Sequence, residues 1–161
     1  MTDLATADAL DRLTEQIIGA AIEVNRQLGP GMLESAYEAC LAHELVGRGL
    51  MFERQRALSL TYKGRVLDCG YRIDILVEGV VVVEIKAVER FDRVHFAQLR
   101  SYLQQSGCKV GLLFNFNTKY LGRDGIKRIV NHFPDAPDMP RTINAESAEG
   151  AEPRFSRTHK R

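Results

Sequence analysis

RIDILVEGVVVVEIKA, from Arg72 to Ala87, is the stretch of this chain that decides its fold. Four consecutive valines are typical of a strand that is covered on both faces of a sheet. This strand nevertheless ends in Glu84 and Lys86, which are two residues apart and therefore point to the same face. Asp74 lies on the strand before it, so charged groups occur where a buried hairpin should have none.

The register of this hairpin decides whether the two acids meet. A two-residue loop at Glu78-Gly79 would place Asp74 and Glu84 on opposite faces. A loop with an odd number of residues, with Gly79 at a positive φ, gives one wholly apolar face instead. Because a slip of one residue turns every side chain over, burial should select the odd loop. The predicted apolar face consists of Ile73, Ile75, Val77, Val81, Val83 and Ile85, and the other face consists of Arg72, Asp74, Leu76, Val80, Val82, Glu84 and Lys86.

Composition predicts one globular domain in the cytoplasm. The chain has 161 residues, 45% of them hydrophobic, and we assign residues 1–133 to a single domain and 134–161 to a disordered tail. Three scattered cysteines fit a reducing compartment, and neither a membrane-spanning run nor a signal-peptide core is expected. A net charge of +1 means that any phosphate binding must come from a local patch.

Apolar periodicity predicts the remaining elements. We expect helices over residues 13–28, 33–48 and 91–105, and strands over 58–62, 66–71 and 110–116, besides the charged hairpin. A short final helix is predicted over residues 125–130. This order predicts an α/β fold in which helices flank a short central mixed sheet.

Asp74, Glu84 and Lys86 on one face suit metal-dependent hydrolysis. Two close carboxylates repel each other unless a cation lies between them, and Mg²⁺ prefers oxygen ligands, with the backbone carbonyl of Ile85 as a further candidate. A bound metal acidifies water and stabilises charge on a phosphate oxygen, while a protonated Lys86 orients the attacking water. The alternative is an ordinary ion pair between Glu84 and Lys86, because E-x-K is a common tripeptide.

Two helices offer further candidate site residues. Glu34 opens the second helix in Gly31-x-x-Glu34-x-x-Tyr37, although acids are favoured at helix N-termini in any case and Tyr37 fits a packing role. The third helix places Gln98 and Tyr102 on one stripe. Such residues suit a phosphate or sugar, or they form the polar border of a packed helix. The expected nucleic-acid contacts are His95, Gln98 and Tyr102 of this helix, and Arg72 of the hairpin.

Taken together, these segments resemble the GxxExxY protein family, a branch of the PD-(D/E)XK nuclease superfamily. The similarity covers about residues 13–130 and is carried by LTEQIIGAAIEV, GPGMLESAYEACLAHEL, YRIDILVEGVVVVEIKAV, AQLRSYL, and VGLLFNFN followed by GIKRIV. The resemblance implies a restriction-endonuclease-like core whose Gln98-x-x-x-Tyr102 helix holds DNA near the cut. It implies catalytic roles for Glu34, Asp74, Glu84 and Lys86. Together with the carbonyl of Ile85, the expected metal ligands are Glu34, Asp74 and Glu84.

The expected function is that of a Mg²⁺-dependent nuclease, with Mn²⁺ as the other candidate ion, that hydrolyses phosphodiester bonds in DNA. The alternative is a non-catalytic binding or regulatory module on the same fold. The choice between DNA and RNA, between endonuclease and exonuclease, and the oligomeric state stay open at this point.

Overall fold

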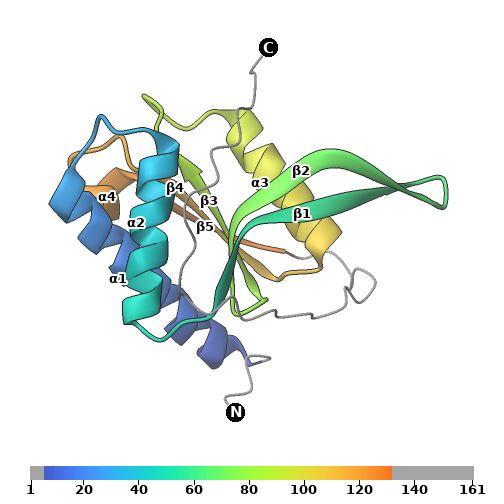
Figure 1. Ribbon diagram of the computed structural model, residues 1–161, viewed down its shortest axis with the longest axis horizontal. Helices are drawn as coiled ribbons and strands as arrows, with labels where there is room; N and C mark the ends of the chain where they lie inside the picture. The colour runs from blue at the N-terminus through green and yellow to red at the C-terminus, as the bar shows by residue number, and fades with distance from the viewer. Residues whose placement is uncertain (1–5, 132–161) are drawn as a thin grey trace.

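The computed structural model describes residues 6–131, so the predicted tail over residues 134–161 lies outside the described part of the chain. Four helices and five strands make up this part (Figure 1). In chain order they are α1 (Ala7–Leu28), α2 (Glu34–Gly47), β1 (Phe52–Tyr62), β2 (Arg65–Val77), β3 (Val81–Lys86), α3 (Arg93–Ser106), β4 (Val110–Asn115), α4 (Leu121–Asp124) and β5 (Ile126–Val130). None of these helices is long and apolar enough to cross a membrane.

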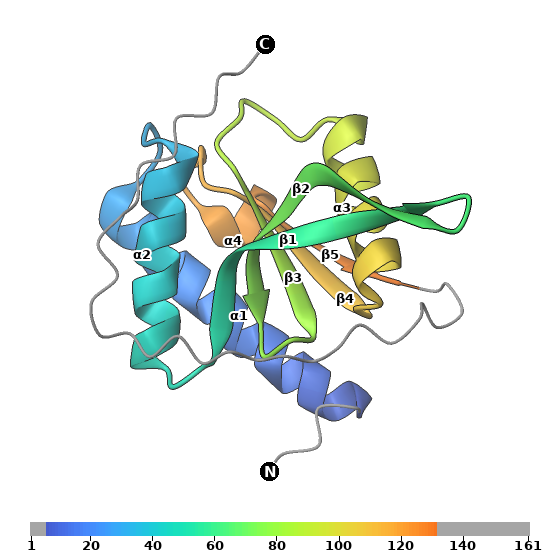
Figure 2. The same cartoon turned by 45° about the vertical axis from the view of Figure 1, so that its right-hand side comes forward.

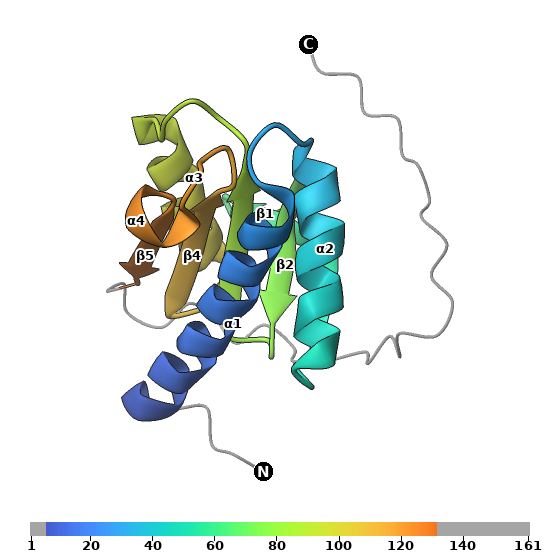
Figure 3. The same cartoon turned by 90° about the vertical axis from the view of Figure 1, so that its left-hand side faces the viewer.

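The five strands form one sheet in the order β1-β2-β3-β4-β5, and the prediction of a mixed sheet flanked by helices is confirmed. Only β3 and β4 pair in parallel, and the other neighbours are antiparallel. Helices α1 and α2 cover one face and α3 covers the other (Figures 1 and 3). Each face therefore has its own hydrophobic cluster, a larger one beneath α1 and α2 and a smaller one beneath α3.

The predicted odd register of the charged hairpin is confirmed. Ile75 lies opposite Val83 and Val77 lies opposite Val81, which leaves a three-residue loop over residues 78–80. Gly79 adopts the expected positive φ of 68°, and Glu78 shares this conformation at 52°. Burial thus selects the register that puts the two acids on one side of the sheet.

The predictions for Val80 and Ile73 are wrong. Val80 lies in the loop before β3 and packs against the cluster beneath α1 and α2, not with Leu76 and Val82. Ile73 is fully buried, but it packs in the cluster beneath α3, whereas Ile75 packs beneath α1 and α2. Strand β2 pairs with β3 only from Ile75 to Val77. Its earlier residues, back to Arg65, pair only with β1 and form a long hairpin (Figure 1). The alternation of faces is therefore broken at Asp74, and Ile73 lies on the opposite face of the sheet from Ile75.

The predicted final helix over residues 125–130 is also wrong, because Ile126–Val130 is strand β5. It pairs antiparallel with β4, from Phe114 opposite Ile126 to Val110 opposite Val130. A five-residue segment rich in β-branched residues gains little as an isolated helix and more from an open strand edge. The only helical turn of this region comes earlier, in α4.

Tyr37 anchors the loop that leads into α2. Its hydroxyl donates a 2.6 Å hydrogen bond to the carbonyl of Gly29 and accepts one of 3.1 Å from the N–H of Met32. Its ring stacks on Phe116 with centroids 4.7 Å apart. The loop and the first turn of α2, which carries Glu34, are therefore held against the end of the sheet.

We expect Tyr37→Phe to lower the free energy of unfolding by about 1–2 kcal/mol, because two backbone groups lose their partner in a buried setting. Urea unfolding followed by circular dichroism measures this change. Tyr62→Phe is the matched control, since Tyr62 is 58% exposed. Equal effects of the two substitutions would contradict the anchoring role of Tyr37.

Candidate active site

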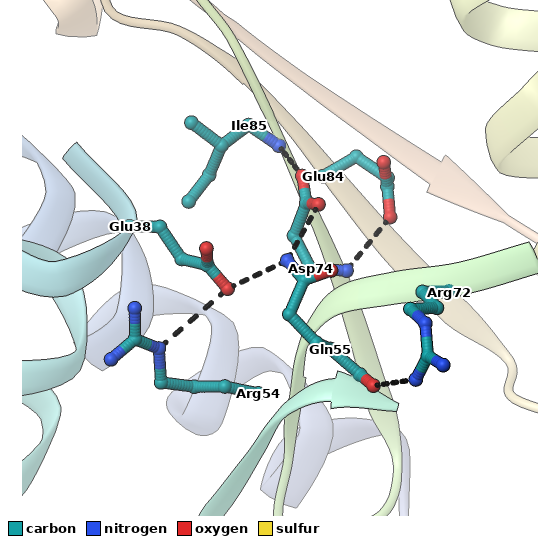
Figure 4. Close-up of polar contacts among 7 residues, drawn as sticks. All are labelled: Glu38, Arg54, Gln55, Arg72, Asp74, Glu84 and Ile85. Atoms are coloured by element: carbon teal, nitrogen blue, oxygen red, sulfur yellow. Dashed lines mark hydrogen bonds and ion pairs between the residues drawn. The ribbon is translucent and has the colours of Figure 1, made fainter. Parts of the chain in front are cut away.

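The centre of the candidate site is a reciprocal contact between Asp74 on β2 and the end of β3. Oδ2 of Asp74 accepts a 2.8 Å hydrogen bond from the N–H of Ile85. In return, the N–H of Asp74 donates a 3.2 Å bond to Oε1 of Glu84 (Figure 4). These contacts begin where the main-chain ladder of β2 and β3 ends. Carboxylates thus take over the hydrogen bonds that a continued ladder would have made.

Burial makes both acids reluctant to ionise. Glu84 is only 3% exposed, and burial followed by the nearby charge of Asp74 raises its pKa from 4.5 to about 9. Burial also raises the pKa of Asp74 from 3.8 to about 6, against the opposing effect of the Ile85 N–H. The pair is therefore short of compensating positive charge.

Lys86 lies close to the acids but does not form the ordinary ion pair that the alternative interpretation predicts. Among the described residues, no carboxylate oxygen lies within 4.0 Å of its ammonium. Its Nζ instead donates a 3.1 Å bond to Oε1 of Gln98, whose Nε2 donates a 2.9 Å bond to the hydroxyl of Tyr102. The charge of Lys86 still lowers the pKa of both Asp74 and Glu84.

Glu34 reaches the same strand end from the other layer of the fold. It is the first residue of α2, and its Oε1 accepts a 3.2 Å hydrogen bond from the N–H of Ala87, directly after β3. Its charge is among those that raise the pKa of Asp74. The structure therefore brings Glu34, Asp74 and Glu84 together with Lys86, although they are spread over more than 50 positions of the sequence.

The sequence analysis missed two residues of this site, Glu38 and Gln55. Glu38 is 7% exposed, and its charge raises the pKa of Asp74. Nε2 of Gln55 donates to Oε1 of Glu38 at 3.0 Å and to Oδ1 of Asp74 at 3.4 Å (Figure 4). The i, i+4 spacing of Glu34 and Glu38 on one helix was a usable signal for Glu38. Gln55 offered no signal, because its position follows from its φ of 52° within β1.

Arg54 adds a further positive charge, with its Nε 3.6 Å from Oε1 of Glu38 (Figure 4). The guanidinium is half exposed, so this contact contributes little stability. It partly balances Glu38 and leaves the deeper Asp74–Glu84 pair uncompensated.

The predicted nucleic-acid contacts fall into two groups. Gln98 and Tyr102 join the site through Lys86, as described above. His95 instead completes the N-terminal cap of α3, where its Nδ1 accepts a 2.9 Å hydrogen bond from the N–H of Asp92. Arg72 is exposed beside the acids, and its Nη1 donates a 3.2 Å bond to the carbonyl of Gln55.

The backbone of Ile85, predicted to be a metal ligand through its carbonyl, lies at the same point. Its N–H points toward Asp74, and the N–H and carbonyl of one strand residue point the same way. Within residues 6–131, however, no three Asp, Glu, His or Cys side chains form a ready group of ion ligands. The oxygens of Asp74, Glu84 and Glu34 are turned onto peptide N–H groups.

The raised pKa of Glu84 predicts that Glu84→Gln stabilises the metal-free protein at pH 8. The folded state holds this proton more tightly than the unfolded state. The contribution of Glu84 to stability is therefore fully present below pH 4.5 and is lost as the pH rises toward 9. Glutamine keeps the acceptor for the Asp74 N–H and removes the charge. We expect a gain of roughly 1–3 kcal/mol at pH 8 and little change at pH 4.5.

Urea unfolding in the presence of a chelator at both pH values measures this difference. Glu89→Gln is the matched control at an exposed position two residues beyond Ala87. A gain from Glu84→Gln that is the same at both pH values would contradict a burial-driven proton.

One known protein family matches most of this chain. A sequence profile described as the PD-(D/E)XK nuclease superfamily matches residues 11–129, a range that contains every site residue described above. No curated protein and no solved structure matches the chain. The match covers most of the chain, and the mixed five-stranded sheet flanked by helices agrees with the core of that superfamily. This protein belongs to the PD-(D/E)XK nuclease superfamily.

Proposed function

We propose that this protein is a Mg²⁺-dependent nuclease that hydrolyses phosphodiester bonds in DNA. The observation that carries the proposal is the contact between the half-buried Asp74 of β2 and the buried Glu84 of β3, two acids beside Lys86 that are short of positive charge. PD-(D/E)XK nucleases generally use divalent metal ions. Mg²⁺ is our choice of ion and Mn²⁺ the second choice, because the available donors are all oxygens.

The donor set of the site fits a hard divalent cation. Asp74, Glu84 and Glu34 offer carboxylates, and the carbonyl of Ile85 faces the same side of β3. A cation would remove the repulsion that now raises the pKa of both buried acids. The carboxylates must then exchange their peptide N–H partners for the ion, which Asp74 and Glu34 can do by side-chain rotation.

A bound divalent ion supplies charge to a phosphate oxygen and acidifies a water molecule. The residues of the chain provide the remaining functions. Lys86 brings an ammonium group to the reacting phosphate, where it orients the attacking water and stabilises developing negative charge. Gln98 holds this ammonium through its amide oxygen, and Tyr102 holds Gln98 in turn. Gln55 sets the distance between Asp74 and Glu38.

We assign contacts with the DNA backbone to residues at the rim of the site. Arg72 is exposed two residues from Asp74, which suits a phosphate next to the scissile bond. Gln98 and Tyr102 can hold a phosphate or sugar from the α3 side. A neutral His95 that accepts at Nδ1 carries its proton on Nε2, and this leaves a donor for a more distant phosphate.

We also propose that the chain belongs to the GxxExxY branch of the superfamily. The motif Gly31-x-x-Glu34-x-x-Tyr37 has a physical role for both of its later residues. Glu34 binds the peptide after β3, and Tyr37 anchors the loop before α2. The motif therefore joins the acid of α2 to the strand that carries Glu84 and Lys86.

A non-catalytic binding or regulatory module is the second candidate function. The observation in its favour is that Asp74, Glu84 and Glu34 all have peptide N–H partners without any ion. A fold with this internal hydrogen bonding is complete in the absence of metal. Activity and metal binding measured together separate the two functions, as in the following two predictions.

Lys86→Met should reduce the rate of DNA cleavage with Mg²⁺ by roughly 10²–10³-fold, because one donor of charge to the transition state is lost. Single-turnover cleavage of plasmid and linear DNA measures the rate. Lys127→Met is the matched control, an exposed lysine on β5, and should cleave like the wild type. An inactive wild type, or equal rates for both variants, would exclude the nuclease.

Asp74→Asn should abolish stabilisation of the fold by Mg²⁺. An ion that binds only the folded state stabilises it by about 1.4 kcal/mol at ten times its dissociation constant. We therefore expect the wild-type melting temperature to rise with Mg²⁺ and that of Asp74→Asn to stay constant, whereas Asp124→Asn, at an exposed position in α4, should respond like the wild type. A wild type that shows no shift and no calorimetric heat of ion binding would favour the non-catalytic module.

A further inference from the structure

The hairpin of β1 and β2 extends well beyond the sheet. Past Asp74 the two strands pair only with each other, as far as the Lys63-Gly64 turn. Figures 1 and 2 show this hairpin projecting past α3 and away from the remaining strands. We call residues 57–72 the arm. Its β2 strand is exposed from Arg65 through Arg72 without interruption, and Leu58 at the base of β1 is the arm's buried residue, packed in the cluster beneath α3.

The arm is a local basic patch on a nearly neutral protein. It contains Lys63, Arg65 and Arg72 and one acid, Asp68, for a net charge of +2, whereas the whole chain has +1. The one acid is already engaged, because its Oδ1 accepts a 3.0 Å hydrogen bond from the N–H of Gly70. The arm therefore supplies local positive charge of the kind that phosphate binding requires, next to the acids of the site.

Large side chains on the arm are exposed as well. Tyr62 is 58% exposed, Val66 is 71% exposed and Tyr71 is 45% exposed. Lys63 lies over the ring of Tyr62, with Nζ 5.6 Å from its centroid, and Arg65 is the cross-strand partner of Tyr62. Aromatic rings interleaved with cations are suited to sugars and bases next to phosphates.

We infer that the arm is a DNA-binding ribbon that grips the duplex beside the cleavage site, an inference that rests on the proposed nuclease function. A two-stranded ribbon fits the major groove of B-DNA. The arm starts at the acids themselves, since Arg72 is two residues from Asp74. Its occupant is therefore the same DNA molecule whose phosphodiester bond lies at Asp74 and Glu84.

The length of the arm sets where this contact falls. Ten positions separate Asp74 from Gly64 along β2, which corresponds to roughly 25–30 Å in a twisted strand. At about 3.4 Å per base pair, the tip contacts the duplex about eight base pairs from the scissile bond. Lys63 and Arg65 make these distal contacts, with two phosphates as their partners.

A second copy of the chain fits the arm less well. A symmetric pair of arms would bring Lys63 and Arg65 of one copy against basic residues of the other, at the tip or at Arg72. Like charges placed opposite each other destabilise such a pairing. DNA presents the complementary charge along the full length of the arm.

The double substitution Lys63→Gln with Arg65→Gln tests the inference. Glutamine removes both charges while keeping an unbranched side chain, which Lys63 needs at its φ of 49°. Fluorescence anisotropy with a fluorescein-labelled duplex of about 30 base pairs, in EDTA, gives the affinity over a range of salt. We expect roughly ten- to fiftyfold weaker binding at 0.1 M salt and a slope of log K against log salt reduced by about two. A DNA hairpin with a stem of about five base pairs, shorter than the distance from the site to the tip, should show little difference.

The matched control is Arg12→Gln with Lys109→Gln. Both residues are exposed and outside the arm; Arg12 lies on α1, and Lys109 precedes β4 at the opposite end of the sheet from Lys86. This variant should bind like the wild type, and thermal unfolding and light scattering verify that both double variants are folded and equal in mass.

Three outcomes would overturn the inference. Equal binding by the arm variant and the control, in a wild type that binds and cleaves DNA, would exclude the arm and leave the nuclease intact. A change in oligomeric mass with unchanged DNA affinity would assign the arm to a second copy. A wild type that neither binds nor cleaves DNA would remove the proposed function, and the inference with it.

Discussion

The site depends on one hydrogen bond, from the N–H of Ile85 to the carboxylate of Asp74. Where one strand separates from its neighbour, the peptide groups of the neighbour lose their hydrogen-bond partners. Unpaired peptide groups in a buried setting are costly. Asp74 stands at the point where β2 departs from β3, and its side chain satisfies the first peptide of β3 that has lost its partner. Asp74 therefore has a structural role in the fold in addition to its proposed role in catalysis.

This arrangement carries an electrostatic cost. The separation of β2 from β3 leaves the N–H of Ile85 without a main-chain partner and also brings Asp74 against the buried Glu84. Both carboxyl groups have a raised pKa as a result. Lys86 is too far away to form a direct ion pair, and it is held toward α3 by Gln98. A site that is fully hydrogen-bonded but deficient in positive charge is poised to take up a cation, whereas a neutralised ion pair would not be.

The bend of β2 also connects the site to the arm. Because β2 is one strand from Arg65 to Val77, the segment that supplies Asp74 continues directly into the exposed basic ribbon, with a bulge at Cys69 and Gly70. Gln55, on the facing strand, adopts a positive φ at the same bend and bridges Asp74 to Glu38. The local distortion of β1 and β2 therefore positions Asp74 and connects it to Glu38 of α2. It also lies where the arm leaves the sheet.

The sequence by itself determined the register of the charged hairpin, because only one register keeps the valine-rich face apolar, and this placed Asp74 with Glu84. It also determined the mixed sheet flanked by helices, through strong periodicity. Only the tertiary structure decided the face of Ile73, the strand at Ile126–Val130 and the recruitment of Glu38 and Gln55. These features arise from where β2 separates from β3 and where the edge of β4 needs a partner, and neither is encoded in the period of a short segment. Local pattern reports which side a residue faces along a regular element, whereas bends and strand edges are settled by contacts between residues far apart in the chain.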